Sequence, residues 1–190
     1  MRNIYIITGP IGSGKSSACK FLKKHGFKYI NSDKFAKDII RSNKTIKKNI
    51  SRLLNLHKDL SERIPWKKIR NFISNNTENK RKYNAIIHDV FYKLLNEKIN
   101  NEYDYVIEIP LIETIDKIKQ KKTIICILTD YKNRKERFIK NKYKSEPQFE
   151  TLNKLQESHD FYVKNSDYVI YNNKRIDAMN NKLISIINKP

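Results

Sequence analysis

The sequence predicts an α/β fold built on a central parallel sheet, and three features of the chain support this prediction. Short apolar runs rich in β-branched residues alternate with helical segments, as crossover connections between parallel strands require. Several of these runs are apolar throughout, which is typical of strands that are covered on both faces. A glycine-rich turn directly after the first run opens the first helix. The 190 residues suffice for one domain, or for one domain with a helical appendage.

The N-terminal segment has the pattern strand, loop, helix and strand. Residues 3–8 are mostly β-branched or aromatic, and the helix that follows the loop extends to about His25. Gly26 stands where a left-handed C-terminal cap would end that helix. A second strand over 27–30 precedes Asp33, so this carboxylate is expected at the carboxyl edge of the sheet, which lines the ligand crevice in such folds.

The rest of the chain is first helical and then returns to strands. Residues 34–101 show helical periodicity only, with Pro65 starting one helix and a long helix over 78–100. Strands are expected over 103–109, 123–129 and 168–171, and helices over 131–140, with Asp130 as N-cap, 148–164 and 176–188. A polar gap over 142–147 precedes the helix over 148–164, and no linker separates two independent domains.

Composition limits the classes of protein to consider. The chain has 40 Lys and Arg residues against 20 Asp and Glu, a net charge of +20 that often accompanies nucleic-acid binding. The lysines are spread over the whole chain beside many Asn and Ile residues. Because these three residue types share A/T-rich codons, a genome rich in A and T explains the number of lysines without a functional demand for them. No stretch approaches the ~20 apolar residues of a bilayer span, so a cytoplasmic protein without a membrane partner is expected. Cys19 and Cys126 lie in apolar-periodic segments and are expected to be reduced core thiols.

The glycine-rich turn contains the motif that predicts chemistry. Gly9 to Ser16 fits the P-loop pattern G-x-x-x-x-G-K-[ST], between a buried strand and a helix. Gly12 and Gly14 allow the backbone to present N–H groups to phosphate oxygens at a helix N-terminus. Lys15 can reach the β- and γ-phosphates, and the Ser16 hydroxyl is suited to ligate Mg²⁺. The motif therefore predicts a three-layer P-loop NTPase fold that uses a nucleoside triphosphate and magnesium.

Further residues separate the classes of P-loop protein. The chain lacks the Asn-Lys-x-Asp motif by which GTPases bind guanine. It is also short for a motor ATPase. Such an ATPase needs an acidic residue at the end of a second apolar strand, and the candidates here are Glu108 and Asp130. Both have simpler interpretations, Glu108 as a polar strand end and Asp130 as a helix cap. Asp33 could accept a proton from an attacking hydroxyl, help to hold the metal, or cap the next helix. Arg137 precedes a possible lid, where a cation would balance phosphoryl charge. A small-molecule kinase is the class that fits best.

The order and spacing of several segments narrow this class. They are the P-loop, Asp33, His88, Pro110-Leu111, Gln156 and Asn172-Asn173. With these segments the chain resembles the bacterial dephospho-coenzyme A kinase family over nearly its whole length. The resemblance implies transfer of the ATP γ-phosphate to the ribose 3′-hydroxyl of dephospho-coenzyme A, the last step of coenzyme A biosynthesis. ATP and dephospho-coenzyme A are then the expected partners, and no specific nucleic acid is expected.

The resemblance also implies a kinase core over 1–33, 102–137 and 149–190, a helical substrate-binding region over 34–101 and a lid over 138–148. It implies residue roles by position as well. Asp33 would be the base near the acceptor hydroxyl, and Lys15 and Arg137 would steady the phosphates. The implied ATP-binding residues are Gly12, Ser13, Gly14, Lys15, Ser16 and Ser17, with Ser16 on Mg²⁺; the implied acceptor-binding residues are Asp33, His88, Pro110 and Leu111. Asn31 replaces a common acidic residue, and Asn141 stands where a second lid arginine is expected. Lys140 or Lys142 could replace that arginine only as point charges.

Two alternatives stay open on the sequence. Another small-molecule kinase, acting on a nucleoside monophosphate or a sugar acid, would share the loop and the fold and differ in its acceptor. A basic nucleic-acid-binding protein with a vestigial P-loop would bind RNA or DNA at physiological salt, whereas adventitious binding by lysines weakens steeply as salt rises.

Overall fold

The structure is a computed structural model that describes residues 2–56, 60, 63–140 and 145–188. It separates into two compact units. The first combines Met1–Asn31 with Ile99–Pro190, and the second is Ser32–Lys98. In the described parts of the chain the first unit contains the sheet, and the second is made of helices. The second unit is thus an insertion in the chain between two strands of the first.

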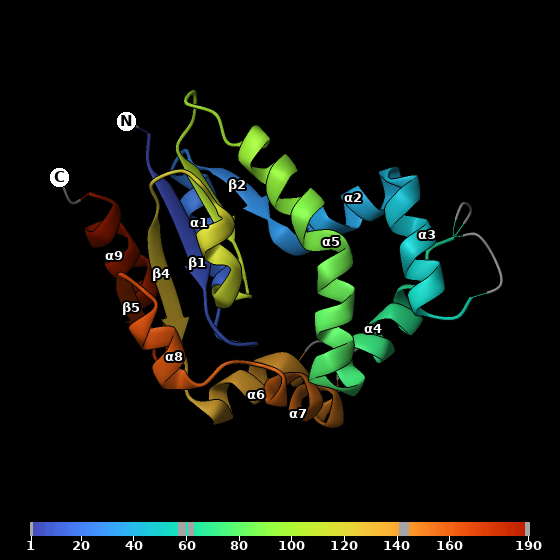
Figure 1. Cartoon of the computed structure of the whole chain (residues 1–190). Coiled ribbons are helices and arrows are strands. Elements are labelled where there is room, and N and C mark those ends of the chain that lie inside the picture. The colour runs from blue at the N-terminus through green and yellow to red at the C-terminus, as the bar shows by residue number, and fades with distance from the viewer. Residues whose placement is uncertain (1, 57–59, 61–62, 141–144, 189–190) are drawn as a thin grey trace. The chain divides into compact units, whose positions relative to one another are not determined.

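Five parallel strands form the sheet of the first unit (Figure 1). They are β1 (Ile4–Thr8), β2 (Lys28–Asn31), β3 (Tyr105–Glu108), β4 (Thr123–Leu128) and β5 (Tyr168–Tyr171), in the spatial order β2-β3-β1-β4-β5. β1 lies between β3 and β4, and Ile7 is in register with Glu108 on one side and Ile125 on the other. Because the strand order reverses at β1, the loop that leaves β1 lies at the position where open α/β sheets bind ligands.

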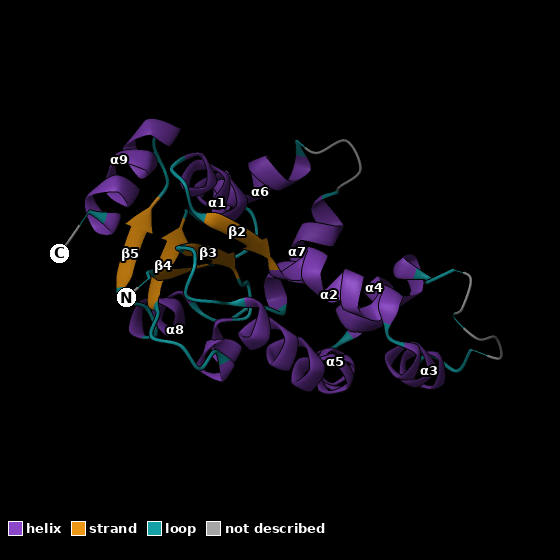
Figure 2. Cartoon of the chain, turned by 90° about the horizontal axis from the view of Figure 1, so that it is seen from above, coloured by secondary structure: helices purple, strands orange, loops and turns teal. Residues whose placement is uncertain are grey.

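Helices cover both faces of this sheet (Figure 2). α1 (Lys15–Lys24) and α9 (Ile176–Ile187) lie on one face, and α8 (His159–Lys164) lies on the other. Under α1 and α9, alternate residues of the strands pack against buried helix residues such as Leu22 and Leu183. All five residues of β1 are buried, which explains why this strand is apolar without alternation.

The two cysteines belong to this buried region. Cys19 and Cys126 are both buried and both free, which confirms the expectation of core thiols without a disulfide. Burial raises the pKa of Cys126 to about 12, so its thiol stays protonated and poorly reactive at neutral pH.

The segment after β4 differs from the prediction. Asp130 takes the N-cap position of α6 (Tyr131–Ile139) as expected, but its side chain makes no capping hydrogen bond. The single helix expected over 148–164 is wrong, because α7 (Glu146–Lys154) and α8 are separate helices. Ser158 is the cause: its backbone is extended, and its side chain accepts a hydrogen bond from the Phe161 N–H at 3.2 Å. A serine that caps a helix start in this way competes with continuing the preceding helix.

The second unit consists of four helices in its described residues. They are α2 (Ser32–Ser42), α3 (Lys44–Leu53), α4 (Trp66–Asn75) and α5 (Thr77–Lys98), and α5 packs against each of the other three. Phe35 of α2 and Phe91 of α5 make an edge contact with ring centroids 5.4 Å apart. Among all described residues of the chain, no helix has the length and apolar character that a membrane span needs.

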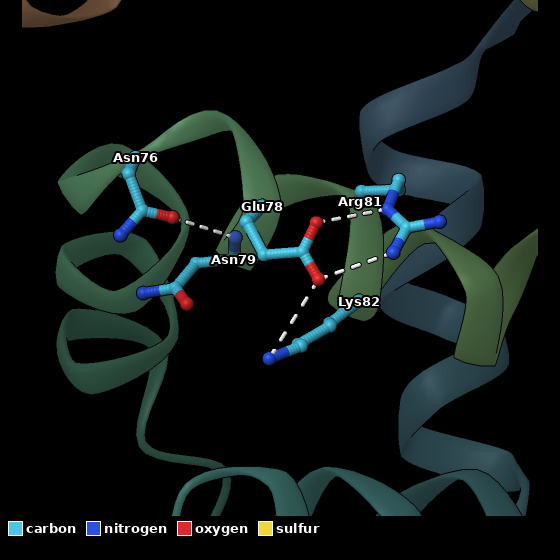
Figure 3. A network of polar contacts seen from close by, with 5 residues as sticks. All are labelled: Asn76, Glu78, Asn79, Arg81 and Lys82. Carbon is cyan, nitrogen blue, oxygen red and sulfur yellow. Dashed lines mark hydrogen bonds and ion pairs between the residues drawn. The ribbon is translucent and has the colours of Figure 1, made fainter.

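A polar network fixes the start of α5 (Figure 3). The side chain of Asn76 accepts a hydrogen bond from the Asn79 N–H at 2.8 Å. Glu78 accepts two hydrogen bonds from Arg81, at 3.0 and 3.1 Å, and lies 3.7 Å from Lys82 Nζ. The hydrogen bond with Arg81 lowers the pKa of Glu78, and a carboxylate in a first turn also complements the helix dipole. Since these side chains are exposed, the network defines the helix start and adds little stability.

Gly9, the last residue before the turn after β1, provides a test of the packing. Its φ is +133°, and a Cβ at this position would stand 2.2 Å from the carbonyl oxygen of Ile127 in β4. Gly9→Ala is expected to lower the free energy of unfolding by roughly 3 kcal/mol, against about 1 kcal/mol for Gly26→Ala. Gly26 is the matched control, since its φ is +92° but nothing lies within 4 Å of an added Cβ. Urea unfolding measures both variants, and equal losses would contradict the predicted clash.

Candidate active site

The loop between β1 and α1 has a backbone suited to bind phosphate. Gly9, Gly12 and Gly14 have φ values of 133°, 78° and 109°, which L side chains rarely adopt. Gly14 is the N-cap of α1 and contributes no capping side chain. The first N–H groups of a helix have no intrahelical acceptor, and the positive end of the helix dipole lies at the same place. The loop can therefore bind an anionic phosphate group at this helix N-terminus.

Two residues of the predicted ATP-binding set use their N–H groups within the loop. The Ser13 N–H donates to the Pro10 carbonyl at 3.2 Å, and the Ser17 N–H donates to the Gly14 carbonyl at 3.0 Å. Ser13 is also fully buried. These two serines therefore shape the turn, and the sequence pattern alone did not distinguish them from the other members of the set.

The side chain of Lys15 folds back onto the same turn. Its Nζ donates to the carbonyl oxygens of Gly9 and Pro10, at 2.8 and 2.9 Å. The ammonium group is thus placed at the P-loop with its charge directed to oxygen atoms of the loop. Its three donors can serve phosphate oxygens in the same way.

Arg137, on α6, is brought to the P-loop from a distant part of the chain. Its NH2 group donates to the Asn172 carbonyl at 2.8 Å, and NH1 lies 3.3 Å from Thr129 Oγ1 and 3.4 Å from the Ser13 carbonyl. The side chain of Asn172 donates to the same Ser13 carbonyl at 2.8 Å. The ends of β4 and β5 therefore hold this guanidinium beside the loop, where it adds a permanent positive charge.

Glu108, at the end of β3, is a further member of the site. Its Oε1 accepts a hydrogen bond from Ser16 Oγ at 2.7 Å. Its Oε2 accepts hydrogen bonds from the Tyr29 hydroxyl and from Asn31 Nδ2, the latter at 2.8 Å. The residue is only 7% exposed, and these donors replace the water that burial removes. Burial and the hydrogen bond with Glu108 raise the pKa of Tyr29, so its hydroxyl keeps the proton that it donates.

Glu108 is not among the predicted site residues, because a polar strand end was the simpler interpretation of its position. The available signal was an acidic residue at the end of an apolar strand. What was missing was the pairing of β3 with β1, which places Glu108 in register with Ile7, two residues before the P-loop begins. Asn31, noted for replacing an acidic residue, proves to be a hydrogen-bond donor to this carboxylate.

Asp33 and His88 belong to the second unit. Asp33 lies in the first turn of α2, two residues after the end of β2 in the chain. Burial, and secondly the negative charge of Asp33, raise the pKa of Tyr83 on α5 to about 12. The ring of His88, also on α5, lies 5.8 Å from that of Tyr92 in an edge contact. Asp33 and Tyr83 thus act on each other within this unit.

Pro110 and Leu111 belong to the first unit and follow β3. The Pro110 carbonyl lies 3.5 Å from the Tyr162 hydroxyl of α8, and Leu111 directly precedes a 3₁₀ helix over Ile112–Lys117. The predicted lid over 138–148 is described only in part. Asn141, which stands where a second lid arginine is expected, and Lys142, which could replace that arginine as a point charge, lie outside the described residues.

The strand order and the glycine-rich turn between β1 and α1 define an α/β P-loop fold. The solved structure of a dephospho-CoA kinase from Campylobacter jejuni shares this fold, with a TM-score of 0.62 at 22% identity over 98% of this chain and 96% of that one. A shikimate kinase from Acinetobacter baumannii also shares it, with a TM-score of 0.59 at 16% identity over 98% of this chain and 93% of that one. The predicted α/β P-loop fold is thereby confirmed.

The sequence comparisons specify the family within this class. The family model for dephospho-CoA kinase matches residues 4–178. The dephospho-CoA kinase of Fusobacterium nucleatum is 33% identical over 182 residues, which cover 93% of this chain and 93% of that protein. The chain belongs to the dephospho-CoA kinase family, and the resemblance inferred from its segments is confirmed.

Proposed function

We propose that this protein transfers the γ-phosphate of ATP to the ribose 3′-hydroxyl of dephospho-coenzyme A, producing coenzyme A and ADP. The observation that supports this reaction most strongly is the match of the family over residues 4–178, in a chain whose phosphate-binding turn has a complete set of glycines, lysine and serine. The family supplies the acceptor, and the turn supplies the means to bind the phosphates of ATP.

The phosphate-binding turn holds ATP. The segment from Gly12 to Ser17 surrounds the phosphates, with Ser13 and Ser17 maintaining the turn through their own hydrogen bonds. Lys15 steadies the β- and γ-phosphates, and Arg137 adds a second fixed charge from α6. Negative charge on the transferred phosphoryl group increases as the transition state forms. Two cations beside this group therefore stabilise the transition state more than they stabilise the bound substrate.

Magnesium fits the pair formed by Ser16 and Glu108. A hydroxyl and a carboxylate 2.7 Å apart offer the oxygen ligands that Mg²⁺ prefers, and phosphate oxygens and water complete such sites in kinases. Ser16 would ligate the ion, and Glu108 would hold one of its waters. When bound, the ion would neutralise charge on the phosphates. Tyr29 and Asn31 keep the Glu108 carboxylate in place.

Asp33 is the base of the proposed reaction. It accepts the proton of the 3′-hydroxyl while the oxygen forms its bond to the γ-phosphorus and the bond to ADP breaks. His88, Pro110 and Leu111 bind the acceptor, residues 34–101 form the acceptor-binding region, and residues 138–148 form the lid. These assignments extend the family's pattern to the matching positions of this chain.

A panel of acceptors tests the proposed function. With Mg·ATP at physiological salt, ADP is expected to form with dephospho-coenzyme A at about 1–100 s⁻¹, a range typical of kinases. Nucleoside monophosphates, shikimate and buffer alone are expected to give no turnover above background. Turnover with one of those acceptors in place of dephospho-coenzyme A would contradict the acceptor assignment. If no acceptor supports ADP formation and the protein binds RNA at physiological salt, the nucleic-acid alternative would be favoured.

The Glu108 carboxylate is expected to determine the magnesium requirement. Glu108→Gln keeps the size of the side chain and an oxygen that can accept the Ser16 hydrogen bond, but it removes the negative charge. The Mg²⁺ concentration for half-maximal rate is expected to rise about tenfold, since partners of metal ligands typically contribute 10- to 100-fold in affinity. Titrating free Mg²⁺ at constant ATP measures this. Glu157→Gln, at an exposed carboxylate, is the control, and an unchanged Mg²⁺ requirement in Glu108→Gln would exclude the carboxylate from the metal site.

A further inference from the structure

Two side chains from outside the P-loop bind one residue near its apex. The Ile11 N–H donates to Gln156 Oε1 at 2.9 Å, and the Ile11 carbonyl accepts a hydrogen bond from Arg134 NH1 at 3.4 Å. These partners stand 145 and 123 positions further along the chain. Both polar groups of the Ile11 main chain are therefore engaged by the segment that follows β4.

Arg134 is itself held in place on several sides. Its Nε donates to the Thr129 carbonyl at 3.1 Å, and NH1 donates to Asn153 Oδ1 of α7 at 2.7 Å. The guanidinium carbon lies 5.8 Å from the ring centroids of both Tyr131 and Phe149. Three directional hydrogen bonds and two aromatic contacts leave this planar group little freedom, which a lysine ammonium could not reproduce.

The main chain of Arg134 also contacts the loop. A Cβ on Gly12 would stand 2.4 Å from the Arg134 carbonyl oxygen, so the backbone of α6 lies directly against the residue after Ile11. The side chain of Arg134 thus contacts Ile11, and its main chain contacts Gly12, the next residue of the loop. Gln156 completes this contact from the turn after α7.

We propose that Arg134 and Gln156 are positioning residues that set the P-loop for ATP, an inference that rests on the proposed kinase function and deepens it. The hydrogen bonds at Ile11 orient its peptide groups, and this orientation determines how the following residues, Gly12 to Ser17, present their N–H groups. A loop held in its binding conformation loses less conformational freedom when the ligand binds. Neither side chain touches the phosphates in this role. Their contribution is to nucleotide affinity.

Two variants test this role, each removing one of the two hydrogen bonds at Ile11. Arg134→Lys keeps the charge and loses the planar fork, and Gln156→Met keeps the length of the side chain and loses the acceptor. The KM for ATP and the dissociation constant of ADP are both expected to rise about tenfold, while kcat and the KM for dephospho-coenzyme A stay within about twofold. Lys132→Gln is the matched control, because it removes an exposed cation from the same helix.

ADP binding is measured by calorimetry without acceptor, so this test stands even if the chain phosphorylates a different acceptor. Unchanged ADP affinity in both variants would overturn the proposal. A lower melting temperature with unchanged ADP affinity would show a packing role only and would also overturn it. Equal weakening of ADP binding by Lys132→Gln would assign the effect to net charge and would likewise overturn the proposal.

Discussion

Replacing Lys15 by methionine is expected to lower kcat by about 10³-fold or more, because the variant loses a cation that stabilises charge on the transferred group. Methionine keeps most of the aliphatic stem, so the packing of α1 should persist. The loss also removes the hydrogen bonds from Nζ to the carbonyls of Gly9 and Pro10. Single-turnover measurement of ADP formation at saturating Mg·ATP and dephospho-coenzyme A isolates the effect on phosphoryl transfer from the effect on binding.

Lys20→Met is the control for this prediction, since Lys20 is an exposed cation on the same helix. It is expected to keep wild-type turnover. Thermal unfolding of the Lys15 variant should resemble that of the wild type, which shows that the loss is catalytic. A turnover within tenfold of wild type in folded Lys15→Met protein would remove Lys15 from the proposed catalytic set.

Replacing Asp33 by asparagine is expected to lower kcat by about 10²- to 10⁴-fold, the range that general acid–base groups contribute. Asparagine has nearly the same size and can still accept a hydrogen bond at the start of α2, but it cannot take a proton from the acceptor hydroxyl. The KM for ATP should change little, because Asp33 is proposed to act on the acceptor. Steady-state rates at varied ATP and varied dephospho-coenzyme A separate these parameters.

Asp38→Asn provides the matched control on α2. The Asp38 carboxylate is exposed and lies 2.9 Å from Arg41 NH1, an ion pair of the kind that adds little stability. It is expected to leave kcat unchanged and to alter the melting temperature slightly. If Asp33→Asn behaved like Asp38→Asn, Asp33 would be a helix-start residue and the base of the reaction would have to be sought elsewhere.

The P-loop and most strands were predictable from the sequence because their signals are local. The segment from Gly9 to Ser16 combines glycines with positive φ, a lysine and a serine within a single turn, so its conformation depends on neighbouring residues. The strand over 168–171 was predicted with the bounds that the structure has. Short apolar runs bounded by polar residues contain enough information to locate a buried strand.

Long-range pairs were not predictable. Ser16 and Glu108 are 92 positions apart, and Ile11 and Gln156 are 145 positions apart. The first pair forms because β3 lies beside β1 in the sheet, and the second forms because α7 ends at Lys154, so that Gln156 lies in the turn that follows. Apolar periodicity reports which face of a segment is buried, but it carries no information on which segment becomes the neighbour.

The sequence by itself therefore determined the class of protein, the phosphate-binding turn and the family, since these depend on consecutive residues and their order. The tertiary structure decided which distant side chains complete the turn: Glu108 beside Ser16, Arg137 on Ser13, and Arg134 with Gln156 on Ile11. The physical reason is that dihedral preferences and apolar periods act over a few residues, whereas these hydrogen bonds arise only after the strands have paired and the helices have packed.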